Sequence, residues 1–227
     1  MSQLSAYAYL HGRVRSANRF LMFQVKNAIL VAALRRRRVE EVPGRVSVVT
    51  ATYNRPTVLR EAIDSVRAQS YTNWEQIIVS DGPDDRVTAI VAEYRDPRIR
   101  SFHTNRLPVM GNYQRNFALK HATGEFVIYL DDDNVIYPHC LETMTAGFTH
   151  PEIGYVICPI DYGDTIKHPG PNFQYREIDL LNYMLRRRLV VQVGGQPVHA
   201  AADYLLAHNV ANVSRGCFLE TKIGHHR

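Results

Sequence analysis

Apolar positions along the chain fall into two kinds of segment, short β-branched runs and stretches with one apolar face. The runs predict buried strands and the stretches predict helices. Strands are expected at residues 46–50, 75–80, 99–103 and 125–130, and helices at residues 56–66, 85–95 and 111–122. This strand–helix alternation predicts an α/β fold with a mostly parallel sheet and helices on both faces.

Polar residues follow three of these predicted strands. Thr52-Tyr53-Asn54 comes after the first strand, Asp81 after the second, and Asp131-Asp132-Asp133-Asn134 after the fourth. Ligands of parallel sheets bind beyond the carboxyl ends of the strands, so we expect these groups to meet there.

The three successive carboxylates repel one another unless a cation neutralises them. A hard divalent ion such as Mg²⁺ or Mn²⁺ fits best, since it takes one or two carboxylates together with water and phosphate oxygens. In extended backbone, Asp131 and Asp133 would point to one side and Asp132 to the other. The structural alternative is an exposed acidic turn, or a helix cap from Asp133 or Asn134.

Glycine-rich phosphate loops are absent from the sequence. There is no GxGxxG after the first strand and no GxxxxGK[ST] anywhere. This argues against a dinucleotide oxidoreductase and a P-loop enzyme. A nucleoside diphosphate would instead be held through a metal, in agreement with the carboxylates.

The charge of the chain is concentrated at its start. The net charge is +5, yet residues 1–44 hold eight Lys/Arg and two acids, so the remainder sums to −1. A near-neutral body argues against nucleic acid as a partner. The three cysteines are too few and too widely spaced for a disulfide scaffold, which favours a reducing, cytoplasmic compartment.

Residues 17–34 predict a mostly apolar helix, followed by Arg35 to Arg38. Polar residues interrupt the segment, and its uninterrupted part is too short to span a bilayer. It is also a poor signal peptide, because arginines stand where a cleavage site would be. Residues 13–38 could lie on the inner face of a membrane, or pack on the body or on a second copy. Pro43-Gly44 divides an N-terminal appendage, residues 1–44, from the body, residues 45–227.

Two stretches of the body carry a family resemblance. Residues 46–82 contain the TATYNRP turn and the acidic turn Ser80-Asp81-Gly82, and residues 111–134 contain RNFALKHATGEF followed by the DxD motif. Both resemble the family 2 glycosyltransferases, which have the Rossmann-like GT-A fold. The resemblance covers residues 46–150. It departs where the family usually has Asp-Asp-Gly-Ser, so contact with the base would fall on Asp81 alone.

The resemblance implies a metal-dependent, inverting hexosyltransferase that acts in polysaccharide or glycoconjugate assembly. Its donor would be a nucleoside-diphosphate sugar, most commonly a UDP-sugar, and its acceptor a saccharide or a lipid-linked saccharide. Residues 45–134 would form the donor half and residues 135–227 the acceptor half. The implied donor contacts are Thr52, Tyr53 and Asp81 at the base, Arg115 near the nucleotide, Asp131 and Asp132 at the ribose or sugar, and Asp133 at the Mn²⁺ or Mg²⁺ ion.

An inverting enzyme needs a general base that deprotonates the acceptor hydroxyl. The best match to the family pattern is Asp203 in AADYLLAHNV, with Asp179, Glu177 and Asp161 as alternatives. The structural alternative for Asp203 is an N-cap of a helix that begins near Tyr204.

Two further features lie in the acceptor half. Because some relatives supply a histidine as a third metal ligand, His225 or His226 could do so here, unless both belong to a disordered tail. A helix is predicted at residues 176–188, and its Arg186 to Arg188 could face a phosphorylated acceptor or simply be solvated.

Two other classes of function were weighed. A nucleotidyltransferase on a related fold would need a glycine-rich loop with Arg directly after the first strand, and TATYNRP is not such a loop. A non-catalytic relative that acts as a binding or scaffold protein is supported only by the short C-terminal part and by the missing Glu before Asp203.

Overall fold

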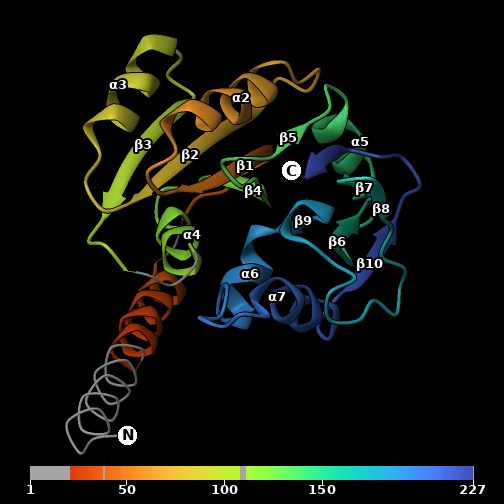
Figure 1. The fold of residues 1–227 in the computed structure, drawn as a ribbon. Coiled ribbons are helices and arrows are strands. Elements are labelled where there is room, and N and C mark those ends of the chain that lie inside the picture. Colours follow the sequence, from red (N-terminus) through yellow and green to blue (C-terminus); the bar gives the residue numbers. More distant parts are fainter. Residues whose placement is uncertain (1–20, 38, 108–110, 227) are drawn as a thin grey trace, which may run out of the picture.

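The computed structural model describes residues 21–37, 39–107 and 111–226. A seven-stranded sheet forms its centre, in the order β10-β6-β9-β4-β1-β2-β3 (Figure 1). These strands are β1 (Val42–Thr52), β2 (Trp74–Asp81), β3 (Ile99–Thr104), β4 (Gly124–Tyr129), β6 (Ile153–Ile157), β9 (Tyr183–Arg186) and β10 (Arg215–Phe218). Strands β1 to β4 pair in parallel, as do β6 and β10, whereas β9 is antiparallel to both of its neighbours. The predicted α/β fold with a mostly parallel sheet is confirmed.

Helices cover both faces of this sheet (Figure 1). They are α2 (Pro56–Arg67), α3 (Asp85–Tyr94), α4 (Asn112–Ala118), α5 (Cys140–Ala146), α6 (Arg187–Val193) and α7 (Ala202–Ala211). Helices α2, α3 and α5 share one apolar core, and α4, α6 and α7 share the other. Val48 belongs to the first core and Val49 to the second, as the alternation of side chains along a strand requires.

A smaller sheet places the end of the chain beside the acidic turn. Its order is β5-β11-β7-β8. The strands are β5 (Val135–Ile136), β7 (Ile160–Tyr162), β8 (Thr165–Lys167) and β11 (Gly224–His226). Because β5 directly follows the three aspartates and pairs with β11, the two C-terminal histidines lie close to them in space. The disordered-tail alternative for these histidines is therefore wrong.

The helix predicted at residues 176–188 is wrong. A short 3-10 helix, η1 (Leu180–Asn182), is followed by β9, and α6 begins only at Arg187. Every residue from Leu180 to Arg186 is buried, as in a strand enclosed between two others, whereas a surface helix would expose one face. The Asp179 carboxylate also caps η1 by accepting from the Leu181 N–H at 3.1 Å.

Two of the three arginines that follow are structural. Arg186 is buried against Glu125 and its Nε donates to the Ile153 carbonyl at 2.8 Å. Arg187 is buried and donates to the Leu119 carbonyl at 3.1 Å, with Glu41 at 3.4 Å. The expectation that these two face an acceptor or solvent is wrong, because buried charges must be paired. Arg188 is exposed.

The N-terminal helix packs on the body beside α4 (Figure 1). Its described part runs over residues 21–36. Phe23, Asn27, Leu30, Val31 and Leu34 are buried at helical spacing. No helix in the described part of the chain is both long and apolar enough to cross a membrane. The predictions for residues 13–20 and Arg38 lie outside the described residues.

Candidate active site

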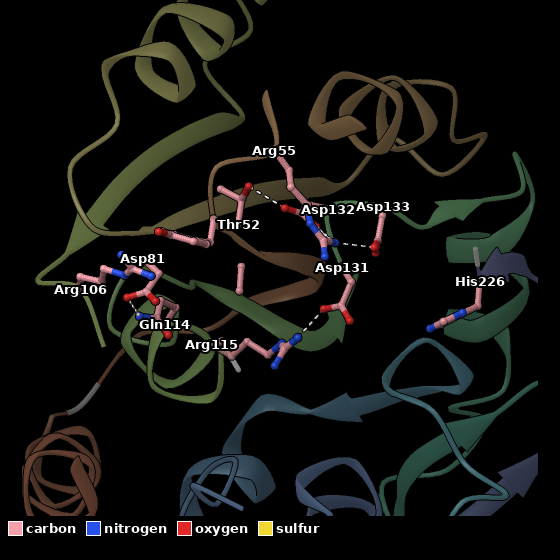
Figure 2. Close-up of a pocket in the computed structure, with 13 residues that line it drawn as sticks. Thr52, Arg55, Asp81, Arg106, Gln114, Arg115, Asp131, Asp132, Asp133 and His226 are labelled. Carbon is pink, nitrogen blue, oxygen red and sulfur yellow. Dashed lines mark hydrogen bonds and ion pairs between the residues drawn. The ribbon is translucent and has the colours of Figure 1, made fainter. Parts of the chain in front are cut away.

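A cavity of about 570 Å³ opens at the carboxyl ends of β1, β2 and β4 (Figure 2). It is lined by Ala51, Thr52, Tyr53, Arg55, Asp81, Arg106, Gly111, Gln114, Arg115, Asp131, Asp132, Asp133 and His226. Eight of the ten residues singled out from the sequence are in this set. The other two, Asp203 and His225, are not.

One end of the cavity is organised around Asp81 (Figure 2). Its Oδ1 accepts from the Leu107 N–H at 2.6 Å and from Gln114 Nε2 at 2.7 Å. Burial raises the pKa of this carboxyl, although the Leu107 hydrogen bond opposes the shift. Beside it, the Arg106 guanidinium lies 4.3 Å from the centre of the Tyr53 ring. A flat aromatic surface next to a fixed acceptor suits a heterocyclic base.

The three aspartates lie in a turn and not in extended backbone. Strand β4 ends at Tyr129, so the predicted alternation of Asp131 and Asp133 against Asp132 is wrong. Asp131 pairs with the buried Arg115 instead. Asp132 is buried and accepts from the Thr52 hydroxyl at 2.7 Å. Burial raises the pKa of Asp132, and the Thr52 hydrogen bond opposes that shift.

Arg55 neutralises the outer part of this turn. Its Nη1 lies 2.5 Å from Asp133 Oδ2 and 3.4 Å from Asp132 Oδ1 (Figure 2). The side chain of Arg55 is 56% exposed, so it is free to exchange this position for another. In the structure, Arg55 is thus a cationic partner of these carboxylates, whereas the sequence predicted a divalent metal ion in that role.

The carboxylates of the turn at Asp131 to Asp133 could bind a hard divalent ion only together with other ligands, such as the phosphate groups of a substrate. Among the residues that the structure describes, no three His, Cys, Asp or Glu side chains are grouped closely enough to hold a metal. Mg²⁺ and Mn²⁺ commonly take one or two carboxylates from the protein and complete their shells with water and substrate phosphate.

The two C-terminal histidines face different ways. His226 lines the cavity, across from Asp81 and Arg106 (Figure 2). Its ring stacks on Tyr162 with centroids 4.2 Å apart, and its Nε2 lies 3.7 Å from Asp179 Oδ2. His225 precedes it on the same strand and is not part of the cavity wall.

Asp203 lies in the first turn of α7, behind the cavity wall. The N-cap of α7 is Ala201, so the capping alternative for Asp203 is wrong. Asp203 Oδ1 accepts from Gln196 Nε2 at 3.3 Å. Burial raises the pKa of Asp203 to about 6, and the positive charge of Arg115 limits the shift. A carboxylate with this pKa is largely ionised at neutral pH and still basic enough to accept a proton.

The alternative bases are engaged elsewhere. Asp161 accepts from the Tyr137 hydroxyl at 2.5 Å and from Lys222 at 2.9 Å. Asp179 caps η1. Glu177 is exposed and accepts from the Gln174 N–H at 2.7 Å. Like Asp203, none of the three lines the cavity, so their other hydrogen bonds are what distinguish them.

Five of the thirteen residues that line the cavity were not predicted as site residues. Three of them have polar side chains, namely Arg55, Arg106 and Gln114. Arg55 and Gln114 stand inside the segments that carry the family resemblance, next to residues that were singled out. Arg106 follows the weakest of the predicted strands, where no motif marks it.

The model of the family described as "Glycosyl transferase family 2" matches residues 47–203, from the first strand to Asp203. The chain belongs to glycosyl transferase family 2. A family 2 relative in Escherichia coli, UDP-Glc:alpha-D-GlcNAc-diphosphoundecaprenol beta-1,3-glucosyltransferase WfgD, is 35% identical over 111 residues, 49% of this chain and 44% of that protein. The chain spans less than half the length of this curated relative and of others that it matches.

Solved structures give the same fold. S. aureus TarS in complex with UDP matches with a TM-score of 0.70 and 20% identity, over 80% of this chain and 60% of that one. The mannosyltransferase PcManGT from Pyrobaculum calidifontis, in complex with GDP-Man and Mn²⁺, matches with a TM-score of 0.64 and 21% identity, over 92% of this chain and 64% of that one. At these identities the match shows the fold alone.

Proposed function

We propose that this family 2 protein is a metal-dependent, inverting glycosyltransferase that moves a sugar from a nucleoside-diphosphate sugar to an acceptor hydroxyl. The observation that carries the proposal is the convergence of Thr52, Asp81, Arg115 and the turn at Asp131–Asp133 on one cavity. Residues 45–134 then serve as the donor half and residues 135–227 as the acceptor half, behind the appendage of residues 1–44.

The donor lies across the strand ends in this proposal. Asp81 and Thr52 contact the base, and Tyr53 lies beside it. Arg115 stands near the nucleotide, and Asp131 and Asp132 lie towards the ribose and sugar. The raised pKa of the half-buried Asp81 carboxylate makes it a stronger acceptor for a hydrogen bond from a base N–H.

Asp133 is the protein's metal ligand in this proposal, and His226, which lines the same cavity, is proposed as a second ligand. His226 is preferred over His225 because only His226 lines the cavity. When bound, the metal offsets the negative charge that builds up on the departing nucleoside diphosphate. Arg115 and Arg55 add positive charge to the same region.

Asp203 takes the proton of the acceptor hydroxyl in this proposal. Support comes from its position at the start of α7, its burial and its pKa of about 6. Gln196 donates to Oδ1 of this carboxylate, and the other oxygen, Oδ2, is proposed to take the proton.

The donor is proposed to be a UDP-sugar and the acceptor a saccharide or lipid-linked saccharide in polysaccharide or glycoconjugate assembly. One relative's name specifies UDP-Glc and a diphosphoundecaprenol acceptor, and one neighbour binds UDP. A lipid-linked acceptor requires the enzyme to work at a membrane.

The outer face of the N-terminal helix is proposed to make this membrane contact. Leu21, Met22, Val25 and Ile29 form an exposed apolar stripe on it. The basic N-terminal segment would be attracted to anionic lipid. Flotation with phosphatidylglycerol vesicles tests this, and Val25→Glu should abolish it. Unchanged flotation of that variant would contradict it, as would a salt-resistant dimer held together by this stripe.

Calorimetry tests the donor site. UDP, GDP, dTDP and CDP are titrated with and without Mn²⁺ into the wild-type protein, Asp133→Ala and the surface control Asp64→Ala. Binding of one nucleotide that needs both Mn²⁺ and Asp133 supports the proposal and names the base. If the folded protein binds none of them, the transferase proposal fails and a non-catalytic binding or scaffold role takes its place.

A further inference from the structure

A buried polar residue stands on the inner face of the N-terminal helix. Asn27 is only 8% exposed and lies between the apolar contacts of Phe23 and Leu30. A helix that merely covers apolar surface has no use for an amide here, because burying it is unfavourable without hydrogen bonds. The partner of Asn27 is another buried amide, Asn116 of α4, whose Nδ2 donates to Asn27 Oδ1 at 2.7 Å.

Asn116 is fully buried and binds the loop after α6. Its Nδ2 also donates to the Gln196 carbonyl at 2.7 Å, and its Oδ1 accepts from the Gln196 N–H at 2.8 Å. The two protons of Nδ2 are thus shared between Asn27 and Gln196, which fixes the orientation of the amide. Gly195 permits this close approach, since a Cβ there would lie 2.4 Å from Asn116 Oδ1 and the residue has a φ of +68°.

Gln196 passes the contact on to Asp203. The Gln196 side chain is fully buried, and its Nε2 donates to Asp203 Oδ1 at 3.3 Å. Hydrogen bonds therefore link Asn27 to Asn116, Asn116 to the backbone of Gln196, and the Gln196 side chain to Asp203, across three elements and a loop. Asn116 is also the immediate neighbour of Arg115, which pairs with Asp131 in the donor cavity.

A second contact holds the same loop from the same helix. Arg35 donates through Nη2 to the Gln192 carbonyl at 2.7 Å and through Nε to the Val191 carbonyl at 3.2 Å, at the C-terminal end of α6. These carbonyls are left without helical partners at a helix end. The N-terminal helix thus binds one end of the segment that carries Gln196 directly through Arg35, and reaches its other end through Asn116.

We propose that Asn27 is a positioning residue of the active site, which orients Asp203 through Asn116 and Gln196. The inference rests on the proposed function for the role of Asp203 as base, while the hydrogen-bond chain itself is independent of that role. The N-terminal segment then has two tasks: its inner face aligns the base, and its outer face is left for a partner.

The test measures the titration midpoint of Asp203 from the NMR chemical shift of its carboxyl carbon, in full-length protein labelled with ¹³C-aspartate. The Asp203→Asn variant identifies the Asp203 signal, because that signal is missing from its spectrum. Asn27→Leu removes the acceptor and keeps the size. Asn27→Asp keeps an acceptor. Val31→Ala is the matched control, since Val31 is buried on the same helix and is an apolar residue. Other ionisable groups interact electrostatically with the Asp203 carboxyl, and none of them is substituted in these variants. They are Arg115, Asp131, Asp179, Lys167 and Tyr183.

Asn27→Leu should raise the Asp203 titration midpoint by about half a pH unit, because a loosened Gln196 donor stabilises the carboxylate less. Asn27→Asp and Val31→Ala should leave the midpoint in place. Release of UDP from UDP-glucose should fall about tenfold in kcat in Asn27→Leu, with the donor KM within about twofold. Equal midpoints in Asn27→Leu and Val31→Ala would overturn the inference. A shifted midpoint together with full activity of Asp203→Asn would leave the hydrogen-bond chain standing and remove Asp203 as the base.

Discussion

The proposed donor half, residues 45–134, and the proposed acceptor half, residues 135–227, build their sites in different ways. In the proposed donor half, most of the functional side chains lie at the carboxyl ends of parallel strands: Thr52 is the last residue of β1, Asp81 is the last residue of β2, and Asp131 to Asp133 come shortly after β4. In the acceptor half, Asp203 is held by Gln196 from a loop, and His226 arrives on a strand of a second sheet. The proposed donor site is therefore built from the ends of strands, and the proposed acceptor site from contacts between residues far apart in the sequence.

Because the two sites are built differently, we expect nucleotide binding and proton transfer to respond to different substitutions. Donor contacts depend on a rigid sheet edge, so single substitutions there should weaken nucleotide or metal binding. The acceptor side depends on how loops and α7 are held, so substitutions there should lower turnover and leave nucleotide binding intact. The predictions below test this separation.

The largest effect is expected for Asp203→Asn. Removing a general base costs about 10²–10⁴ in rate, so kcat should fall by about 10³. The affinity for nucleotide and Mn²⁺ should stay within about twofold of wild type, because Asp203 lies outside the donor cavity. Steady-state kinetics and calorimetry on the same preparation measure both. If Asp203→Asn also lost nucleotide affinity, nucleotide binding and proton transfer would not be separate in this protein.

Asp133→Asn should instead affect the proposed donor site, and with it the binding of nucleotide and Mn²⁺. Losing an interaction that stabilises developing charge lowers kcat by about 10²–10³, and here metal-dependent nucleotide affinity should fall with it. Asp64→Asn, an exposed carboxylate on α2, is the matched control and should behave as wild type. Normal Mn²⁺ dependence in Asp133→Asn would remove this residue as a metal ligand.

The pH dependence of turnover should report Asp203. The pKa of this carboxyl is about 6, and a general base is active in its ionised form. The rate should therefore be level near pH 7 and fall about tenfold for each unit below pH 6. The residual rate of Asp203→Asn should lack this acidic limb. An identical limb in that variant would assign the titration to another group.

A smaller effect is expected for Arg55→Ala. Arg55 competes with a cation for Asp133 and Asp132, so its removal should tighten Mn²⁺ binding in the absence of nucleotide by about threefold to tenfold. The pair is half exposed, and its loss should cost less than about 1 kcal/mol of stability. Mn²⁺ titrations and thermal melts check both statements. Weaker Mn²⁺ binding in Arg55→Ala would show that the arginine assists the metal.

The sequence predicted the donor half well because its information is local. A β-branched run followed by a polar turn predicts both a strand and the place where its chemistry lies, as in Thr50 to Asn54. Arg106 was missed since its role depends on the Tyr53 ring, which lies more than fifty positions earlier in the chain.

The acceptor half was harder to predict because tertiary contacts override its local pattern. Residues 183–186 resemble part of a helix, yet they form β9 because β4 and β6 enclose them on both sides. Arg186 and Arg187 resemble a solvated helix end, and only their buried partners reveal a structural role. The contact of Gln196 with Asp203 likewise depends on Asn116, eighty positions before it.

The central claim is that the strand-end turn binds a divalent metal together with a nucleoside diphosphate. Electron paramagnetic resonance of Mn²⁺ tests it most directly, in titrations of wild type and Asp133→Asn with and without UDP. The account predicts that the signal of free Mn²⁺ falls strongly only when wild-type protein and UDP are both present, beyond what UDP alone removes. Equal Mn²⁺ uptake by Asp133→Asn, or uptake by the wild type that UDP does not increase, would contradict the account.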